Sequence, residues 1–305
     1  LLKQSIAKQY ARKGKEVISK NQQAVDESLK GIRELKYDRS KWLACTPETK
    51  EQHTGFDKII QYSLENRGDE ISVDEITDYT YAPAGTAKKE KRGIAVFVPV
   101  WDEKKCVQCN TCSICCPHAV IRPYLLTDAE KQNLTTVPAK GKEFKGLNFR
   151  IQISPMDCTS CGVCVNACPA SALSMVPVGK VLEQEKKNVE ICNAATNKGH
   201  LVKPTNVRNS QFQLPLLEFN GACPGCGEPA IMKLLTQLFG DRLYLTAATG
   251  CDLIWGATYP FNPWCTNERG HGPAWANSLF EDNAEFGYGV YNGVVARREQ
   301  LKPVI

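Results

Sequence analysis

The sequence of 305 residues is 42% hydrophobic and 23% charged, with a formal net charge of +5 and 15 cysteines. This composition excludes a disordered or collagen-like chain, and no apolar run approaches the roughly 18–20 residues that span a bilayer. Residues 1–41 hold eleven Lys and Arg against five Asp and Glu, so the remainder is close to neutral. This basic segment lacks interleaved aromatic residues. We therefore interpret it as a solvated helix and expect neither nucleic acid nor a membrane as a partner.

Residues 1–41 are predicted to be the helical tail of a preceding domain, with one helix over residues 4–36 and weak points at Gly14 and Gly31. Apolar residues recur there at spacings of three and four, and core packing would explain the stripe. Its members are Val17, Ile18, Val25, Leu29, Ile32 and Leu35. Residues 42–93 are interrupted by Gly and Pro and indicate a linker module with one strand-like run at residues 70–73.

Residues 94–180 contain an internal repeat built around two sets of cysteines that start 52 residues apart. A strand is expected before each set and a short return strand after it. The strands before the sets cover residues 94–101 and 148–154, and the return strands include residues 119–121 and 172–173. Residues 122–147 are interpreted as an insertion between the two halves.

Residues 181–211 are polar and irregular in pattern, which indicates a linker. Residues 212–305 then become rich in Gly and Leu. A helix is predicted at 230–239 and a strand at 243–248, followed by a long stretch rich in Gly, Pro and Trp. This alternation predicts the beginning of an α/β domain.

Each cysteine set has the spacing Cys-x2-Cys-x2-Cys-x3-Cys-Pro, which is typical of bacterial [4Fe–4S] ligands. The first set is Cys106, Cys109, Cys112 and Cys116, and the second is Cys158, Cys161, Cys164 and Cys168. In two-cluster ferredoxins the fourth cysteine of each set ligates the other cluster. We therefore assign cluster A to Cys106, Cys109, Cys112 and Cys168, and cluster B to Cys158, Cys161, Cys164 and Cys116. Zinc sites and disulfide scaffolds do not repeat this pattern, so both are disfavoured.

These motifs predict an α+β fold with a ferredoxin-like two-[4Fe–4S] domain, in which a βαβ unit is repeated with pseudo-twofold symmetry. Cys115 falls outside the ligand spacing and is interpreted as a small buried filler. His118 is interpreted as a surface or packing histidine, although its charge could adjust a cluster potential. Three cysteines without a partner at ligand spacing are interpreted as structural: Cys45, Cys192 and Cys265.

A third group combines Cys223 and Cys226, in Cys-Pro-Gly-Cys-Gly-Glu, with Cys251, in Thr-Gly-Cys. Alone, Cys-x2-Cys could also be a redox dithiol or half of a zinc site. The Gly-rich context and a third cysteine after a predicted strand instead suggest three of four ligands for another cubane.

Long strings of residues across nearly the whole chain resemble one family, the pyruvate:ferredoxin (flavodoxin) oxidoreductases. They include the doubled cluster motif and residues 21–26, 90–95, 145–152, 218–227, 248–251, 254–257 and 272–282. The resemblance implies an internal fragment, with the ferredoxin domain followed by the truncated beginning of a thiamine-diphosphate-binding domain. The first residue, Leu1, agrees with this expectation because it is not an initiator Met.

The resemblance implies that Cys223, Cys226 and Cys251 ligate a third [4Fe–4S] cluster, and that Glu228 and Cys251 line the thiamine pocket. It places the fourth ligand of that cluster and the Mg²⁺ ligands outside this chain, together with the pyruvate residues and most of the CoA site. The catalytic residues are therefore unknown from this chain. His271 lies in a Gly-rich loop and is not expected to act directly, and nothing assigns a step to Asn277 or Glu281.

The implied activity is the oxidative decarboxylation of pyruvate with CoA to acetyl-CoA and CO₂, with electrons leaving one at a time for ferredoxin or flavodoxin. We expect the full-length enzyme to be a homodimer in the cytoplasm or in an anaerobic mitochondrion-related organelle, and this fragment alone to be inactive. Two alternatives stay open. One is a related 2-oxoacid oxidoreductase or an NADP-linked fusion. The other is a non-enzymatic ferredoxin-type carrier, which would have no need of the third cysteine group.

Overall fold

The computed structural model describes residues 1–43, 53–79 and 81–304. The chain divides into two compact units, residues 1–52 and residues 53–305. Cys45 lies outside the described residues. None of the helices in the described ranges combines the length and hydropathy that crossing a membrane requires.

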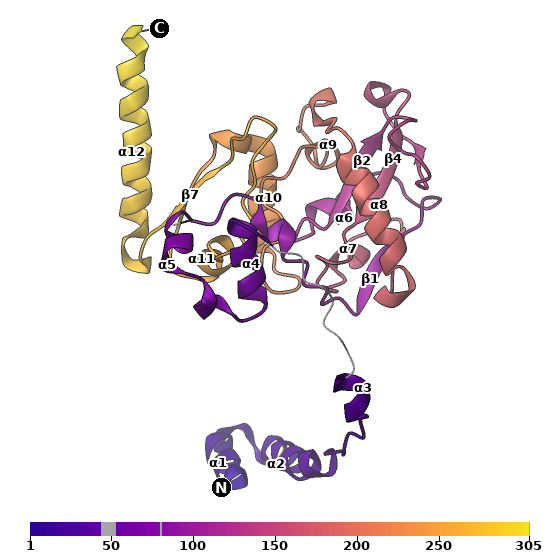
Figure 1. Cartoon of the computed structure of the whole chain (residues 1–305), viewed down its shortest axis with the longest axis vertical. Coiled ribbons are helices and arrows are strands. Elements are labelled where there is room, and N and C mark those ends of the chain that lie inside the picture. The colour runs from indigo at the N-terminus through magenta and orange to yellow at the C-terminus, as the bar shows by residue number, and fades with distance from the viewer. Residues whose placement is uncertain (44–52, 80, 305) are drawn as a thin grey trace. The chain divides into compact units, whose positions relative to one another are not determined.

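The first unit is a helical hairpin rather than one helix (Figure 1). It comprises α1 (Leu2–Gln9), η1 (Ala11–Lys13), α2 (Lys15–Lys30) and α3 (Arg39–Leu43). The helix predicted over residues 4–36 is wrong in its extent because Gly14 adopts a φ of 91° and α2 ends at Gly31. Lys3 forms an ion pair with Asp26, which holds α1 against α2.

The apolar stripe predicted in this unit does not form a core at its carboxyl end. Ile32 is 73% exposed and Leu35 is 84% exposed. Both follow the end of α2, so the helical spacing that would align them with Val25 is lost. The prediction that core packing explains the whole stripe is therefore wrong.

The second unit begins with a small helical module. It contains α4 (Phe56–Leu64), η2 (Gly68–Glu70), α5 (Val73–Thr77) and η3 (Thr86–Lys89). Phe56, Ile59 and Ile60 form its core. The strand-like run expected at residues 70–73 is wrong, because Ser72 and Glu75 form a capping box that starts α5.

The middle of the second unit carries two small antiparallel sheets. Its strands are β1 (Phe97–Trp101), β2 (Ile121–Leu126), β3 (Val137–Pro138), β4 (Asn148–Ile153) and β5 (Leu173–Pro177). The strand β1 pairs with β5, and β2 pairs with β4, which also pairs with β3. Each strand that leads into a cysteine set therefore pairs with the return strand of the other set, and the two halves are intertwined. The first return strand is longer than predicted and enters the segment that was interpreted as an insertion.

The core between these sheets is aromatic and aliphatic. Phe144 and Phe149 are fully buried, and both rings meet the ring of Phe212 edge-on, with centroids 5.0 and 6.4 Å apart. Ile121 and Ile151 fill the same core. Three short elements complete this region: α6 (Thr111–Ile114), α7 (Val163–Asn166) and η4 (Lys142–Phe144).

The segment at residues 181–211 is not irregular as predicted, because it forms α8 (Leu182–Ala194), η6 (Gly199–Leu201) and α9 (Val207–Ser210), directly after η5 (Val178–Lys180). The helix α8 lies along the β2–β4 sheet (Figure 1). Gln152 of β4 donates to Glu185 of α8 at 2.6 Å. This helix buries Asn188 and Cys192 instead of an apolar stripe, so its sequence lacks the usual helical pattern.

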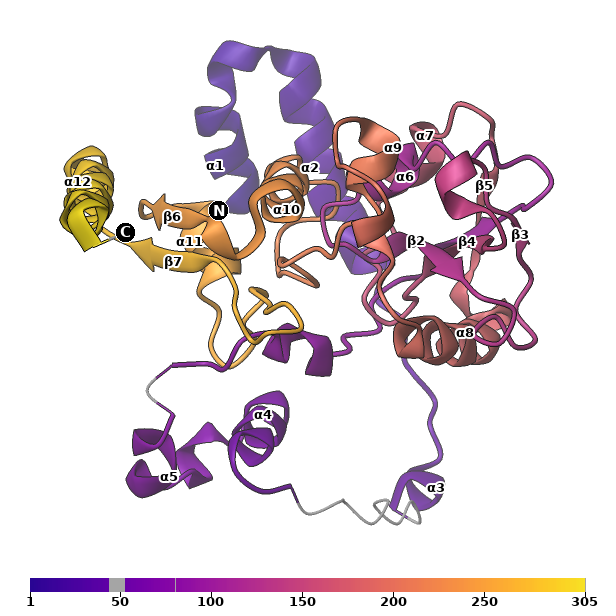
Figure 2. The same ribbon diagram turned by 90° about the horizontal axis from the view of Figure 1, so that it is seen from above.

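The last part of the second unit has the alternating elements of an α/β layer. They are α10 (Glu228–Phe239), η7 (Gly240–Arg242), β6 (Tyr244–Ala247), α11 (Cys251–Gly256), β7 (Ala274–Asn277), η8 (Phe280–Asp282), α12 (Asn283–Leu301) and η9 (Lys302–Val304). The strands β6 and β7 pair in parallel, as Figure 2 shows. The helix and strand predicted at residues 230–239 and 243–248 are confirmed.

Candidate metal centre

The two cysteine loops have the same backbone conformation at equivalent positions. Each loop places non-helical residues in the left-handed region, where φ is positive. The pairs, each 52 residues apart, are Gln108 and Ser160, Asn110 and Gly162, and Ala119 and Ser171. Equivalent helices, α6 and α7, then carry the third cysteine of each set. Backbone turns of this kind direct N–H groups toward a concavity and are common at phosphate and Fe–S sites.

The folding of the strands sorts the eight thiols into two groups, each lining its own cavity. One cavity is lined by Cys106, Cys109, Cys112 and Cys168, together with Trp101, Ile151 and Leu173. The other is lined by Cys116, Cys158, Cys161 and Cys164, together with Pro99, Ile121 and Met175. Because β1 pairs with β5 and β2 with β4, the fourth cysteine of each set is carried across to the other set's cavity. These are the crossed groups that the spacing predicts.

The donor set fits [4Fe–4S] clusters in number and in chemistry. Thiolates are the ligands of such clusters, and each cavity offers four of them with apolar walls. No three Cys, His, Asp or Glu side chains in residues 1–43, 53–79 and 81–304 converge as ligands of a single metal ion would. The thiols instead line two cavities, four to each, which is the number of ligands that one cubane takes.

Burial favours the protonated form of three of these thiols. Burial raises the pKa of Cys158 to about 11, and it also raises the pKa values of Cys112 and Cys164. Since iron binds the thiolate, cluster loading must release these protons. Sulfur atoms also accept hydrogen bonds, from the Ala172 N–H to Cys168 at 3.2 Å and from the Thr111 hydroxyl to Cys109 at 3.2 Å. Such bonds stabilise the anionic sulfur and influence a cluster's potential.

His118 is not the surface histidine that was considered, because it is only 1% exposed. Its Nδ1–H donates to the carbonyl of Asn220 at 3.0 Å, and its ring lines the cavity of Cys116. Burial lowers the pKa of His118. The packing role is therefore confirmed. Cys115 is half-buried, lines neither cysteine cavity and donates to the carbonyl of Cys112 at 3.4 Å.

The third cysteine group lies partly at the surface. Cys223 and Cys226 share one turn, closed by a hydrogen bond from the Cys226 N–H to the Cys223 carbonyl at 3.1 Å. Cys251 begins α11. Cys223, Cys251 and Glu228 are exposed, and within the described residues the three thiols do not form a metal-ion site. A hydrogen bond from the Trp255 indole N–H of α11 to the carboxylate of Glu228, just after the turn, is 3.4 Å long.

The turn of Cys223 and Cys226 packs beside the second cysteine cavity. Gly225 has a φ of 79°, and a Cβ built on it would lie 3.8 Å from Cβ of Cys161 and 3.5 Å from Val163. The preceding residues reach the same cavity, since Asn220 donates to the carbonyl of Pro117 at 2.9 Å. The turn of Cys223 and Cys226 is therefore adjacent to the cavity that contains Cys161.

The other singled-out residues do not join these groups. Cys192 and Cys265 are buried in packing positions. His271 is exposed, with Nδ1 3.6 Å from the Asp241 carboxylate. Asn277 of β7 and Glu281 of η8 are also exposed.

Comparison with known proteins agrees with this arrangement. Residues 105–172 match a family model described as a 4Fe-4S dicluster domain. The chain is 46% identical over its whole length to a pyruvate:ferredoxin oxidoreductase of Moorella thermoacetica. Over 98% of the chain it is 44% identical to a pyruvate-flavodoxin oxidoreductase of Enterobacter agglomerans. The chain is homologous to a segment of the pyruvate:ferredoxin (flavodoxin) oxidoreductases.

This segment spans about a quarter of the length of those relatives, 27% and 26% respectively. The whole chain is also 42% identical to 18% of a protein named pyruvate dehydrogenase [NADP(+)] from Cryptosporidium parvum. The eight cysteines that line the two cavities all lie within residues 105–172, the part of the chain that matches the dicluster model.

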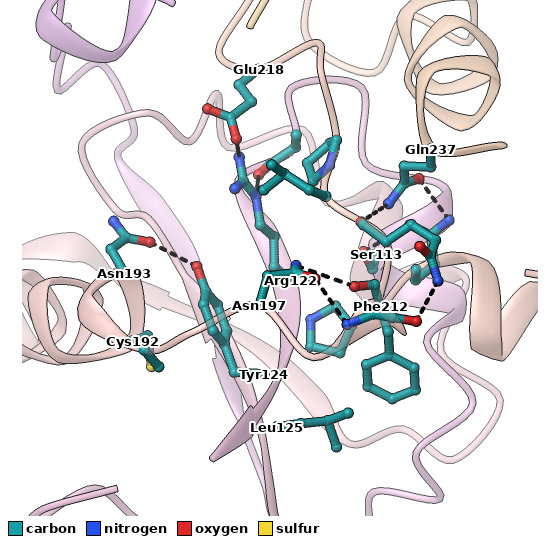
Figure 3. Close-up of a pocket in the computed structure, with 18 of the residues that line it drawn as sticks. Ser113, Arg122, Tyr124, Leu125, Cys192, Asn193, Asn197, Phe212, Glu218 and Gln237 are labelled. Carbon is teal, nitrogen blue, oxygen red and sulfur yellow. Dashed lines mark hydrogen bonds and ion pairs between the residues drawn. The ribbon is translucent and has the colours of Figure 1, made fainter. Parts of the chain in front are cut away.

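A charged group beside the dicluster domain was not predicted from the sequence. A cavity of about 480 Å³ lies between β2 and the residues that follow α8 and precede α10 (Figure 3). Glu218, 2% exposed, forms ion pairs there with Arg122 at 2.7 Å and Lys88 at 3.1 Å. These residues are 34 to 130 positions apart in sequence, so no local sequence pattern predicts their contact.

Lys233, which interrupts the apolar run of α10, was also not predicted as a residue of interest. Its side chain is 1% exposed and donates to the carbonyl groups of Ser113 and Cys116. A single lysine in an otherwise apolar helix was a usable signal, because a buried lysine needs a specific partner.

Proposed function

We propose that this chain conducts electrons one at a time through two [4Fe–4S] clusters as part of a pyruvate:acceptor oxidoreductase. The observation that carries the proposal is the sorting of eight cysteines into two crossed groups of four, each around its own cavity. Cluster A would be held by Cys106, Cys109, Cys112 and Cys168, and cluster B by Cys158, Cys161, Cys164 and Cys116. Each cubane is a one-electron carrier whose potential the protein adjusts.

The position of the third cysteine group supports an order of transfer. Gly225, between Cys223 and Cys226, lies against the loop of Cys161. A third [4Fe–4S] cluster on Cys223, Cys226 and Cys251 would therefore pass electrons to cluster B first. Cluster A would then be the exit to ferredoxin or flavodoxin.

We propose that residues 212–305 begin a thiamine-diphosphate-binding domain, in which Glu228 and Cys251 face the cofactor. Two observations support this. The parallel β6–β7 pair is the start of an α/β layer, and the Glu228–Trp255 hydrogen bond connects α10, which carries Glu228, to α11, which carries Cys251. Thiamine diphosphate with Mg²⁺ would supply the electron sink for decarboxylation. The residues of this chain would receive the electrons.

The substrates of the whole enzyme would be pyruvate and CoA, and its products acetyl-CoA and CO₂. A homodimer in a reducing compartment, cytoplasmic or in an anaerobic mitochondrion-related organelle, remains our expectation. An NADP-linked acceptor is a second candidate, because the chain is also 42% identical to part of a pyruvate dehydrogenase [NADP(+)]. A free-standing ferredoxin is less consistent with the third cysteine group at the edge of the dicluster domain.

Electron transfer from the chain to a flavodoxin or ferredoxin tests the proposal. The chain is reconstituted anaerobically with iron and sulfide, reduced with dithionite, separated from the reductant and mixed with oxidised acceptor in a stopped-flow spectrometer. We expect rapid reduction of the acceptor. With pyruvate, CoA and thiamine diphosphate but no reductant, we expect no acetyl-CoA from this chain alone. If the fully reduced chain left both acceptors oxidised, the proposed electron transfer would be refuted.

A further inference from the structure

Lys233 is a buried cation between the two cysteine groups. Its ammonium donates to the carbonyl of Cys116 at 3.2 Å and to the carbonyl of Ser113, and its side chain is 1% exposed. Cys116 lines the second cavity, and Ser113 follows Cys112 of the first cavity. One ammonium group is therefore in contact with the peptide backbone next to ligands of both proposed clusters.

This charge has no anionic partner in the part of the chain that the structure describes. No carboxylate there lies within ion-pair distance of Lys233, and its acceptors are two neutral carbonyl groups. Arg122, which lines the same 480 Å³ cavity, adds positive charge and is paired with Glu218. An ammonium group buried without a counter-charge costs free energy. In the chain without metal, no neighbouring anion among the described residues compensates the charge of Lys233.

The cysteines are the groups that can supply the compensating negative charge. Burial lowers the pKa of Lys233 to about 8, and negative charge on Cys116, Cys115 or Cys112 acts in the opposite direction and favours the ammonium form. A [4Fe–4S] cluster with four thiolates is anionic, and its charge becomes one unit more negative when it accepts an electron. A fixed cation nearby therefore stabilises the reduced cluster more than the oxidised one.

We propose that Lys233 compensates the charge of the cluster pair and raises its reduction potentials, most of all that of cluster B. The inference rests on the proposed function, from which it takes the cluster positions. In the step concerned, one electron from the upstream donor enters cluster B, no bond forms or breaks, and Lys233 keeps its proton. Lys233 lies on α10, which begins directly after the turn of Cys223 and Cys226. It would thus make cluster B a better acceptor for an electron that leaves the third group.

Potentiometric titration of the reconstituted chain, followed by EPR, tests this. We expect Lys233→Met to lower the equilibrium constant for one-electron reduction of cluster B at least tenfold, which is about 59 mV, with a smaller decrease for cluster A. Lys233→Arg keeps the charge and should retain the wild-type potentials. Lys187→Met removes one exposed charge on α8 and serves as the matched control, with both potentials unchanged. Iron-loaded Lys233→Met with wild-type potentials would overturn the inference.

A variant that loses iron is also informative. Lys233→Gln, which keeps an N–H donor, replaces the Met variant in the titration if the latter does not hold clusters. If neither neutral variant holds iron while Lys233→Arg does, and all apo variants unfold at the wild-type temperature, the charge itself is required and the proposal stands. Apo neutral variants that unfold well below the wild-type temperature would make Lys233 a structural residue and refute it. Wild-type chain that binds no iron would instead refute the proposed function.

Discussion

Replacing Cys116 by Ser should remove cluster B and leave cluster A intact, although Cys116 belongs to the same sequence motif as three ligands of cluster A. The reason is geometric, since Cys116 lines the cavity of Cys158, Cys161 and Cys164. A serine hydroxyl is a poorer ligand than a soft thiolate for cluster iron. We expect the iron content to fall by about half, from roughly eight to roughly four atoms per chain, because each cubane holds four.

EPR of the reduced chain distinguishes the two clusters in this test. Wild-type chain should show the interaction of two neighbouring reduced clusters, and Cys116→Ser the signal of one isolated cluster. Cys168→Ser should give the reciprocal result, with cluster A lost. Cys115→Ser is the matched control, because Cys115 is adjacent in sequence and lines neither cavity, and it should retain both clusters. Loss of cluster A in Cys116→Ser would show that the ligation is not crossed.

Replacing Glu218 by Gln should destabilise the second unit by about 3 kcal/mol, because it removes the counter-charge of Arg122, whose side chain is only 18% exposed. Chemical denaturation at pH 7, followed by far-UV circular dichroism, measures this change. Glu183→Gln is the control. Glu183 pairs with Lys186 at the surface, where its side chain is 77% exposed, and its loss should change the free energy of unfolding by less than about 1 kcal/mol.

The same residue predicts a pH dependence. Burial alone would raise the pKa of Glu218, but Arg122 and Lys88 outweigh it and hold the pKa below its usual range. A lowered pKa in the folded chain contributes stability above the unfolded value of roughly 4.3, and this contribution is lost as the pH falls through the folded pKa. The difference between wild type and Glu218→Gln should therefore be largest above about pH 5 and should shrink in more acidic buffer. A difference that does not change with pH would show that the carboxylate is not the stabilising group.

The features that sequence reasoning predicted are those that local spacing determines. The loops around Cys106 and Cys158 are set by a few residues each, and the crossing of Cys116 and Cys168 follows from the pairing of strands in a repeat. The helix at residues 230–239 was predictable for the same reason, because its apolar positions recur at helical spacing.

The features that it missed depend on contacts made across the fold. The helix α8 buries a polar Asn188 against the sheet, so no apolar stripe reveals it. Arg122 and Glu218 meet only when the chain returns past β2. The sequence around Lys233 predicts an ordinary apolar helix. Its ammonium group contacts the carbonyl groups of Ser113 and Cys116 only because the chain folds α10 against the first cysteine loop.

The iron and acid-labile sulfide content of the anaerobically reconstituted chain tests the central claim most directly. The account predicts roughly eight iron and eight sulfide atoms per chain, in two clusters that EPR resolves after reduction. Zinc and iron are to be measured on the same samples by elemental analysis. Four or fewer iron atoms per chain, or zinc retained in place of iron, would contradict it.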